Sequence, residues 1–152
     1  MGTDTKPLRS LNSDIPSYVT FVNRTSRLAT AWWLDFSGHP VSYGDIQPNG
    51  ELKMNTYQTH PWVFRATENG AALTANQQEV FYPPLTEYQE YISVNIRAPV
   101  YSLRECCLMV VRSLVKSQQD LNTLDIPQTL KQDLLEPSTL WEELNLLNFN
   151  TP

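Results

Sequence analysis

Cysteine, basic residues and long apolar runs are all scarce in this 152-residue sequence. The only two cysteines, Cys106 and Cys107, are adjacent, so they cannot cross-link distant segments or form a zinc site by themselves. Eleven Lys and Arg against sixteen Asp and Glu give a net charge of −5. Nucleic acid and anionic membranes both require a basic surface, so we expect neither as a partner. No run approaches the roughly 18 apolar residues of a membrane-spanning helix.

The sequence also lacks a recognisable secretory signal. Its first fifteen residues have no apolar core of the kind found in signal peptides, which leads us to expect a cytoplasmic and nuclear protein. In those compartments we expect Asn23 of the glycosylation pattern Asn23-Arg24-Thr25 to carry no glycan. With 41% hydrophobic and 18% charged residues, the composition is typical of a folded chain.

Glycine is missing from residues 99–152, whereas residues 1–98 hold all five glycines and 13 of the 16 aromatic side chains. The first region contains short β-like stretches at 18–23, 28–36, 54–65, 80–82 and 92–96. Asn49-Gly50 and Glu68-Asn69-Gly70 are hairpin-type turn signals. Short strands separated by turns predict an antiparallel β-sandwich over 7–98.

Two of these stretches predict side-chain directions. Alternation in 28–36 places Trp32, Leu34 and Phe36 on one face and leaves Trp33 on the other, less apolar face. A tryptophan on the less apolar face is an exception that a binding site would explain.

The stretch 54–65 reads as one long strand. Pro61 must then lie on an edge or at a bulge, because proline cannot donate to a strand ladder. Residues of equal parity share a face of a strand, so Thr56, His60 and Trp62 are predicted to point the same way.

Helical signals follow Pro99. Ser102 and Glu105 form a capping box, which predicts a helix running to about residue 116. Asp125 can cap a second helix over 126–135, with Pro127 tolerated in its first turn.

A second capping box, from Thr139 to Glu142, opens a short helix whose apolar residues are Leu140, Trp141, Leu144 and Leu147. Strands followed by helices are typical of an α+β chain. The predicted fold is an N-terminal antiparallel β-sandwich followed by a small three-helix α domain and a short C-terminal helix. The predicted helical domain covers 99–136, and the terminal helix lies in 137–152.

The helix after Pro99 carries more apolar surface than three short helices can bury. Either the sandwich covers this surface or a partner protein does. Leu103, Cys107 and Val111 recur at i, i+4 and i+8 and form one seam along the helix. A small thiol between two branched side chains makes a shallow strip that can enter an apolar pocket of another protein.

Ser102, Leu103, Cys107 and Val111 together resemble the elongin C-binding box. Six segments also occur in the order and spacing of the von Hippel–Lindau tumour-suppressor family: Leu8-Arg9-Ser10-Leu11-Asn12-Ser13, Phe21-Val22-Asn23-Arg24, Trp33-Leu34-Asp35-Phe36, Tyr57-Gln-Thr-His60-Pro-Trp62-Val-Phe64-Arg65, Pro99-Val100-Tyr101-Ser102-Leu103 and Val110-Val-Arg-Ser-Leu-Val-Lys116. The resemblance covers about residues 7–136 and suggests an ortholog or a divergent paralog within that family.

This resemblance implies a non-catalytic substrate receptor, without cofactors, of an elongin BC–cullin-RING ubiquitin ligase. The sandwich would bind 4-hydroxyproline on hypoxia-inducible factor α through Trp33, Tyr43, Thr56, Tyr57, His60 and Trp62. Elongin C, with elongin B attached, would bind Ser102, Leu103, Cys107, Val111 and Leu114. A cullin with its RING subunit would contact Arg104, Ile126, Pro127 and Asp133, and the final helix would return to the sandwich.

The residues at these positions suit that ligand chemically. A rigid pyrrolidine ring fits between the aromatic walls of Trp33, Tyr43 and Trp62. Its added hydroxyl is one donor and one acceptor, which the Thr56 hydroxyl and the His60 imidazole can match. Unmodified proline would leave these two groups unpaired.

Four departures from the family pattern keep a second interpretation open. Thr56 stands in place of serine, Asn55 in place of histidine, Asp14 in place of arginine, and Cys106 in place of a basic residue. The alternative is an adaptor paralog that keeps elongin binding but has weakened or changed hydroxyproline recognition. An enzyme with a His60–Asp35 dyad is a third possibility, but neither residue is paired with an obvious nucleophile.

Overall fold

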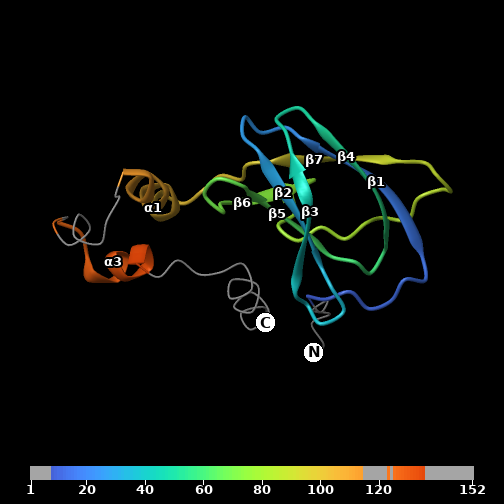
Figure 1. Cartoon of the computed structure of the whole chain (residues 1–152), viewed down its shortest axis with the longest axis horizontal. Coiled ribbons are helices and arrows are strands. Elements are labelled where there is room, and N and C mark those ends of the chain that lie inside the picture. The colour runs from blue at the N-terminus through green and yellow to red at the C-terminus, as the bar shows by residue number, and fades with distance from the viewer. Residues whose placement is uncertain (1–7, 115–122, 124, 136–152) are drawn as a thin grey trace.

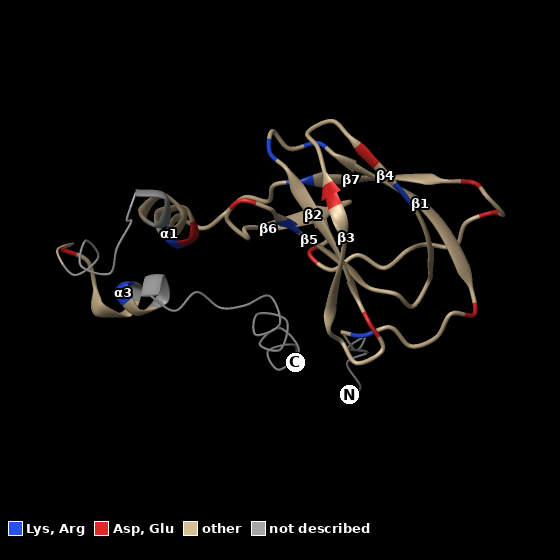
Figure 2. Cartoon of the chain, in the orientation of Figure 1, with Lys and Arg blue, Asp and Glu red and all other residues tan. Residues whose placement is uncertain are grey.

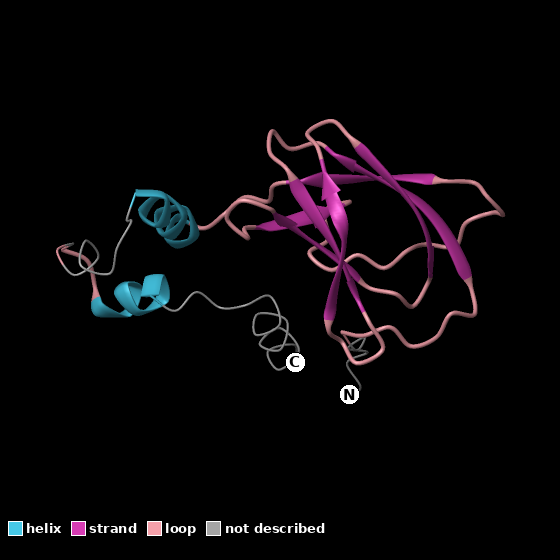
Figure 3. Ribbon diagram, in the orientation of Figure 1, coloured by secondary structure: helices cyan, strands magenta, loops and turns pink. Residues whose placement is uncertain are grey.

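The computed structural model describes residues 8–114, 123 and 125–135. The strands within them are β1 (Pro16–Asn23), β2 (Ala29–Leu34), β3 (Pro40–Ile46), β4 (Glu51–Tyr57), β5 (Trp62–Ala66), β6 (Ala72–Ala75) and β7 (Ile92–Arg97). The described helices are α1 (Leu103–Leu114) and α3 (Gln128–Leu135). The strands gather in one body, and α1 and α3 lie beyond one end of it, connected through the segment after β7 (Figures 1 and 3).

The strands form two layers that share β6. One layer has the order β4-β1-β7-β6 and the other β3-β2-β5-β6. This arrangement confirms the predicted β-sandwich. The prediction that it is wholly antiparallel is wrong at one pair, because β1 and β7 run parallel, with Phe21 opposite Val94. The long chain path between these two strands makes a parallel pair possible.

Phe21 lies at the centre of the core between the layers. Its ring centroid is 5.2 Å from that of Trp62, 4.8 Å from Phe64 and 6.0 Å from Phe81. Val19 and Phe21 both point inward from β1, as the alternation predicts. Burial of each such side chain contributes roughly 1.5–3 kcal/mol. The core therefore fixes β5, and with it one wall of the site described below.

β2 corrects the predicted side-chain directions. Trp32 and Leu34 share a face as predicted, but they pack with Val63 in a small separate cluster. Trp33 points to the main core, so its face is not the less apolar one. Phe36 does not continue the alternation, because β2 ends at Leu34 and the chain then turns.

The predicted long strand over 54–65 is wrong. β4 ends at Tyr57, β5 begins at Trp62, and between them the amide of His60 donates to the carbonyl of Tyr57 at 3.0 Å. β4 pairs with β1 whereas β5 pairs with β2, so the two strands belong to different layers. Pro61 lies in this buried connection and not within a strand.

The predicted turns form, with different consequences. At 68–70 a hairpin joins β5 to β6, and Gly70 adopts a φ of +70° that glycine accommodates without strain. At Asn49-Gly50 the amide of Gly50 donates to Gln47 at 2.8 Å. That turn is no hairpin, since β3 pairs with β2 and β4 pairs with β1. The predicted strand at 80–82 is reduced to a single bridge between Phe81 and Trp62.

Asn23 has a structural role at the end of β1. Its side chain is fully buried, and its Nδ2 donates to the carbonyls of Arg27 at 2.7 Å and Ile46 at 2.8 Å. The amide nitrogen of the glycosylation pattern is therefore engaged inside the fold.

The capping box of α1 is confirmed. The amide of Ser102 donates to Glu105 Oε2 at 2.9 Å, and the amide of Glu105 donates to Ser102 Oγ at 3.1 Å. α3 begins two residues later than predicted, at Gln128, and the carbonyl of Pro127 accepts a bond from the amide of Lys131 at 3.2 Å. The predicted helix over 139–147 lies outside the described residues, so the three-helix domain is not confirmed. Neither described helix has the length and apolarity needed to span a membrane.

Candidate functional site

Six predicted ligand-binding residues meet where the sandwich is open. Among the described strands, β3 and β4 end the strand order and do not pair with each other, so side chains and not strand hydrogen bonds join the two layers here. Trp33 comes from β2, Tyr43 from β3, Thr56 and Tyr57 from β4, His60 from the following turn and Trp62 from β5. The prediction that they gather is therefore met, although they come from five separate elements and not from one long strand.

Aromatic rings form the walls of this site. Trp33 and His60 stack, with ring centroids 5.3 Å apart and an interplanar angle of 29°. Tyr43 lies between the two tryptophans, 6.0 Å from Trp33 and 5.3 Å from Trp62. Tyr57 approaches the His60 ring to 5.0 Å. Mutual edge and face contacts of this kind hold each ring in one orientation.

Ser10 fixes the Trp33 indole and was not singled out by the sequence. Its buried hydroxyl accepts a hydrogen bond from Trp33 Nε1 at 2.8 Å and donates to the carbonyl of Leu34 at 2.6 Å. Phe36 was also missed as a site residue. Its half-exposed ring lies 5.9 Å from that of Trp33 and 5.6 Å from that of His60. The Leu8–Ser13 resemblance segment was the one signal that pointed to Ser10.

Thr56 and Trp62 are joined across the layers. Trp62 Nε1 donates to Thr56 Oγ1 at 3.0 Å, and the Thr56 side chain is only 3% exposed. Because the hydroxyl oxygen accepts this bond, the hydroxyl proton is left to donate to a further acceptor. The strand β4 thus presents one oriented donor to the site.

His60 presents the complementary acceptor. The residue is 7% exposed, and its Nε2 lies 3.0 Å from the carbonyl oxygen of Asn12 and 3.3 Å from Ser13 Oγ. Burial lowers the pKa of His60, and the bond to Asn12 opposes this only in part, so the imidazole is neutral near pH 7. A carbonyl can only accept, so we assign the proton to Nε2 and an unprotonated lone pair to Nδ1.

The carboxylate of Asp35 does not contribute to this site. It accepts from the amides of Ser37 at 2.9 Å and His39 at 2.8 Å. The bonds of the His60 ring go instead to Asn12 and Ser13. The residues described by the structure contain no cluster of three or more His, Cys, Asp or Glu suited to a metal ion.

Asn55 lies on the opposite face of β4 from Thr56. Its Oδ1 accepts a hydrogen bond from the hydroxyl of Tyr91 at 2.5 Å, outside the sandwich. The Asn55 side chain is therefore exposed and bonded to Tyr91 instead of facing Thr56. Asp14 is exposed and follows Ser13, so it remains near the rim of the site.

The predicted partner-binding helix leaves part of its seam uncovered. Leu103 is 81% exposed, Cys107 is exposed and Val111 is half-buried, whereas Leu108 is buried. Ser102 and Arg104 beside this seam are exposed, as is Pro127, and Ile126 is half-buried. The side chains of Leu114 and Asp133 lie outside the described set. The described part of the chain thus covers the apolar surface of α1 only in part.

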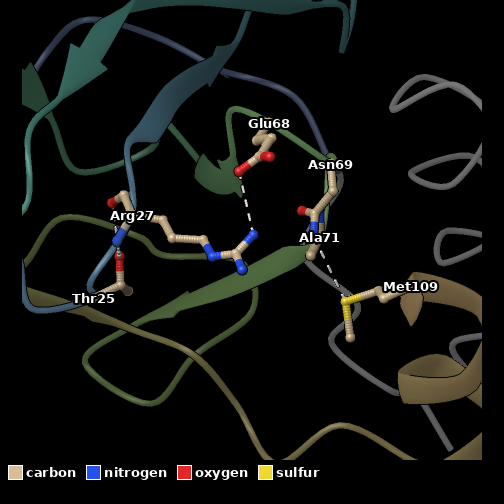
Figure 4. Close-up of polar contacts among 6 residues, drawn as sticks. All are labelled: Thr25, Arg27, Glu68, Asn69, Ala71 and Met109. Carbon is tan, nitrogen blue, oxygen red and sulfur yellow. Dashed lines mark hydrogen bonds and ion pairs between the residues drawn. The ribbon is translucent and has the colours of Figure 1, made fainter. Parts of the chain in front are cut away.

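A small junction connects α1 to the sandwich. Asn69 in the β5–β6 turn points toward Met109, with Nδ2 3.8 Å from the sulfur, and Arg27 pairs with Glu68 nearby at 3.2 Å (Figure 4). The hydroxyl of Tyr101 donates to the carbonyl of Ala72 at 2.8 Å. Of these contacts, the one to Met109 engages the helix itself, and Leu103 takes no part in them.

An aromatic site in a β-sandwich, joined to a helix with an exposed apolar seam, defines a recognition protein with two separate surfaces. Residues 8–89 match the family model of the VHL beta domain, and residues 101–148 match that of the VHL box domain. The chain is similar to "Protein Vhl" of Drosophila melanogaster, with 31% identity over 141 residues that cover 82% of this chain and 79% of that protein. The chain belongs to the VHL family.

Proposed function

We propose that this protein is the substrate-recognition subunit of an elongin BC–cullin-RING ubiquitin ligase, acting in the cytoplasm and nucleus. Its sandwich binds 4-hydroxyproline-containing degradation segments of the hypoxia-inducible factor α type. The observation that carries this proposal is that a buried Thr56 hydroxyl, bonded to Trp62, and a neutral His60 imidazole both lie beside the same group of aromatic rings.

Hydroxyproline matches this arrangement in shape and in polarity. Trp33, Tyr43 and Trp62 offer faces and edges to a rigid ring. The ligand hydroxyl accepts from Thr56 and donates to His60 Nδ1, and both protein groups are nearly buried. Unmodified proline leaves them unpaired, and sites built in this way can discriminate by about 10⁴-fold. One added oxygen atom then acts as the signal for binding.

The unpaired edges beside the site suit an extended peptide. β3 and β4 each end a layer, so their outer backbone groups face no further strand among residues 8–114, 123 and 125–135. A target segment can add to such an edge through backbone hydrogen bonds while one side chain enters the site. Tyr43 and Val41 of β3 are partly exposed there and offer apolar contact to neighbouring target residues.

The α1 seam is the proposed docking surface for elongin C, with elongin B attached. Leu103, Cys107 and Val111 form the shallow strip, and Ser102 and Leu114 flank it. A cullin with its RING subunit contacts Arg104, Ile126, Pro127 and Asp133. The receptor needs no nucleophile, because it promotes ubiquitin transfer by raising the effective concentration of the target.

An adaptor paralog with changed hydroxyproline recognition is the second candidate. Thr56 motivates it, because the threonine carries a methyl group that serine lacks, in a side chain that is almost fully buried. The extra methyl either narrows the space for the ligand hydroxyl or fixes the Thr56 rotamer.

Calorimetric titration separates the two candidates. The full chain, co-purified with elongins B and C, is titrated with hydroxylated and unhydroxylated versions of one peptide from hypoxia-inducible factor α. We expect the hydroxylated peptide to bind at least 100-fold more tightly. The adaptor would be favoured instead if both peptides bind with the same weak affinity and Thr56→Ser changes neither affinity. If Thr56→Ser restores discrimination, the methyl group is the cause.

A further inference from the structure

A second aromatic surface lies on the outside of the sandwich, away from the recognition site. We call it the tyrosine patch, and it consists of Tyr18, Tyr88 and Tyr91. The Tyr18 ring lies 6.1 Å from that of Tyr88 and 5.6 Å from that of Tyr91, with both pairs edge to face. Tyr88 is 81% exposed, and the exposed residues Leu85 and Ile92 belong to the same stretch of sequence.

The patch already holds one cation. The ammonium group of Lys53, from the neighbouring strand β4, lies 5.3 Å from the centroid of the Tyr91 ring. Ring faces attract cations through their quadrupole. Tyr88, being far more exposed than Tyr91, remains open to a second cation from outside.

Carboxylates flank the open part of the patch. Glu87 and Glu90 are both exposed and bracket Tyr88 in one turn, closed by a bond from the amide of Glu90 to the carbonyl of Glu87 at 3.1 Å. Acidic residues lie in the loop before β7, at the end of the sandwich farthest from the helices (Figure 2). A positively charged partner would meet both ring faces and opposite charge there.

The loop that carries Tyr88 is fastened to the sandwich. Ser17 Oγ donates to the carbonyl of Pro84 at 2.6 Å, and the amide of Tyr18 donates to Thr86 Oγ1 at 3.0 Å. Gln89 adopts a left-handed backbone with a φ of 60°, which closes the turn. A surface held in this way loses little conformational freedom on binding.

We infer that the tyrosine patch docks an arginine-rich, extended segment of a partner protein, with a guanidinium over Tyr88 and others paired with Glu87 and Glu90. The planar guanidinium is suited to stacking on aromatic rings and to forked bonds with carboxylates. The patch and the α1 seam lie at opposite ends of the structure, so both can be occupied together. This inference does not depend on hydroxyproline binding.

The test is a calorimetric titration of the full chain with a 12-residue peptide of alternating arginine and proline. A matched peptide replaces every arginine with uncharged citrulline. We expect the arginine peptide to bind and the citrulline peptide not to bind. Tyr88→Ala should weaken binding about 3- to 10-fold while Tyr88→Phe retains it, and Glu87→Gln with Glu90→Gln should weaken it further and reduce its salt dependence.

Tyr43→Ala is the control, because it removes an exposed tyrosine of the recognition site instead. It should leave binding of the arginine peptide unchanged. The inference is overturned if the peptide does not bind at millimolar concentration, if citrulline binds equally, or if Tyr43→Ala weakens binding as much as Tyr88→Ala. Self-association that Tyr88→Ala abolishes, without peptide binding, would assign the patch to a second copy of the chain and also overturn it.

Discussion

The indole of Trp62 donates a hydrogen bond to the hydroxyl of Thr56 over 3.0 Å, and this bond ties β5 in one layer to β4 in the other. Both side chains are buried. The bond therefore has two roles, since it stabilises the sandwich at its open edge and it orients the Thr56 proton. A ligand that accepts from the Thr56 hydroxyl meets a donor whose orientation this bond restricts.

Thr56→Val should destabilise the fold although it preserves volume. The change leaves the buried indole N–H of Trp62 without its acceptor, which typically costs about 1–3 kcal/mol in the free energy of unfolding. Thr56→Ser keeps the hydroxyl and is the matched control. Urea denaturation followed by tryptophan fluorescence measures the difference. A Thr56→Val protein as stable as its Thr56→Ser counterpart would mean that the bond contributes nothing.

Ser10→Ala should loosen the Trp33 wall. Trp33 Nε1 loses its 2.8 Å partner, and the carbonyl of Leu34 loses a donor. We expect a loss of roughly 1–3 kcal/mol of unfolding free energy, together with weaker binding of hydroxylated peptide. Ser26→Ala, which changes an exposed serine of the β1–β2 loop outside the aromatic site, serves as the control. Unchanged stability and affinity in Ser10→Ala would show that packing alone holds Trp33.

Acidification should destabilise the protein through His60. Burial lowers the pKa of this imidazole in the folded state, so the unfolded state binds a proton first as the pH falls. Stability is then complete above about pH 6.5, the ordinary histidine pKa, and decreases as the pH falls toward the lowered folded-state pKa. Urea denaturation at a series of pH values measures this decrease.

His60→Gln should remove this part of the pH dependence. His39→Gln, at the other histidine of the sequence, is the matched substitution at an exposed position. If the unfolding free energy of His60→Gln falls with pH as it does in the starting protein, His60 is not the cause of the pH dependence.

Leu103→Asp should abolish co-purification with elongins B and C without unfolding the sandwich. The side chain is 81% exposed, so a carboxylate there disrupts an intermolecular surface and not the core. Val100→Asp is the matched control, because Val100 is fully exposed just before the helix and outside the seam. A pull-down after co-expression, with circular dichroism of both variants, measures the effect. Elongin binding that survives Leu103→Asp would contradict the proposed interface.

The sequence predicted the sandwich and the capping box of α1, because both depend on local patterns. Alternation identified β1, and Ser102 with Glu105 marked the helix start. The parallel pairing of β1 with β7 left no local signal, because strand direction depends on the path of the whole chain. β3 was missed because most of its residues are exposed and do not alternate, and β6 because it has four residues.

The recognition residues were predicted to meet, but the geometric reason was wrong. Parity along one strand assigned Thr56, His60 and Trp62 to a shared face, whereas the chain turns after Tyr57 and crosses between layers. Thr56 and Trp62 face each other across the core. The family resemblance carried the correct grouping. Ser10 escaped notice because a serine that supports an indole 23 residues away has no signature in a single sequence.

The proposed recognition of the hydroxyproline hydroxyl by Thr56 and His60 is tested most directly with a ligand that keeps the ring shape and removes one of the two hydrogen bonds. The full chain with elongins is titrated calorimetrically with two peptides that differ only in 4-hydroxyproline against 4-fluoroproline of the same ring pucker. Fluorine cannot donate to His60, so the hydroxyproline peptide should bind at least about 10-fold more tightly. Equal affinity for the two peptides would contradict the paired roles of Thr56 and His60.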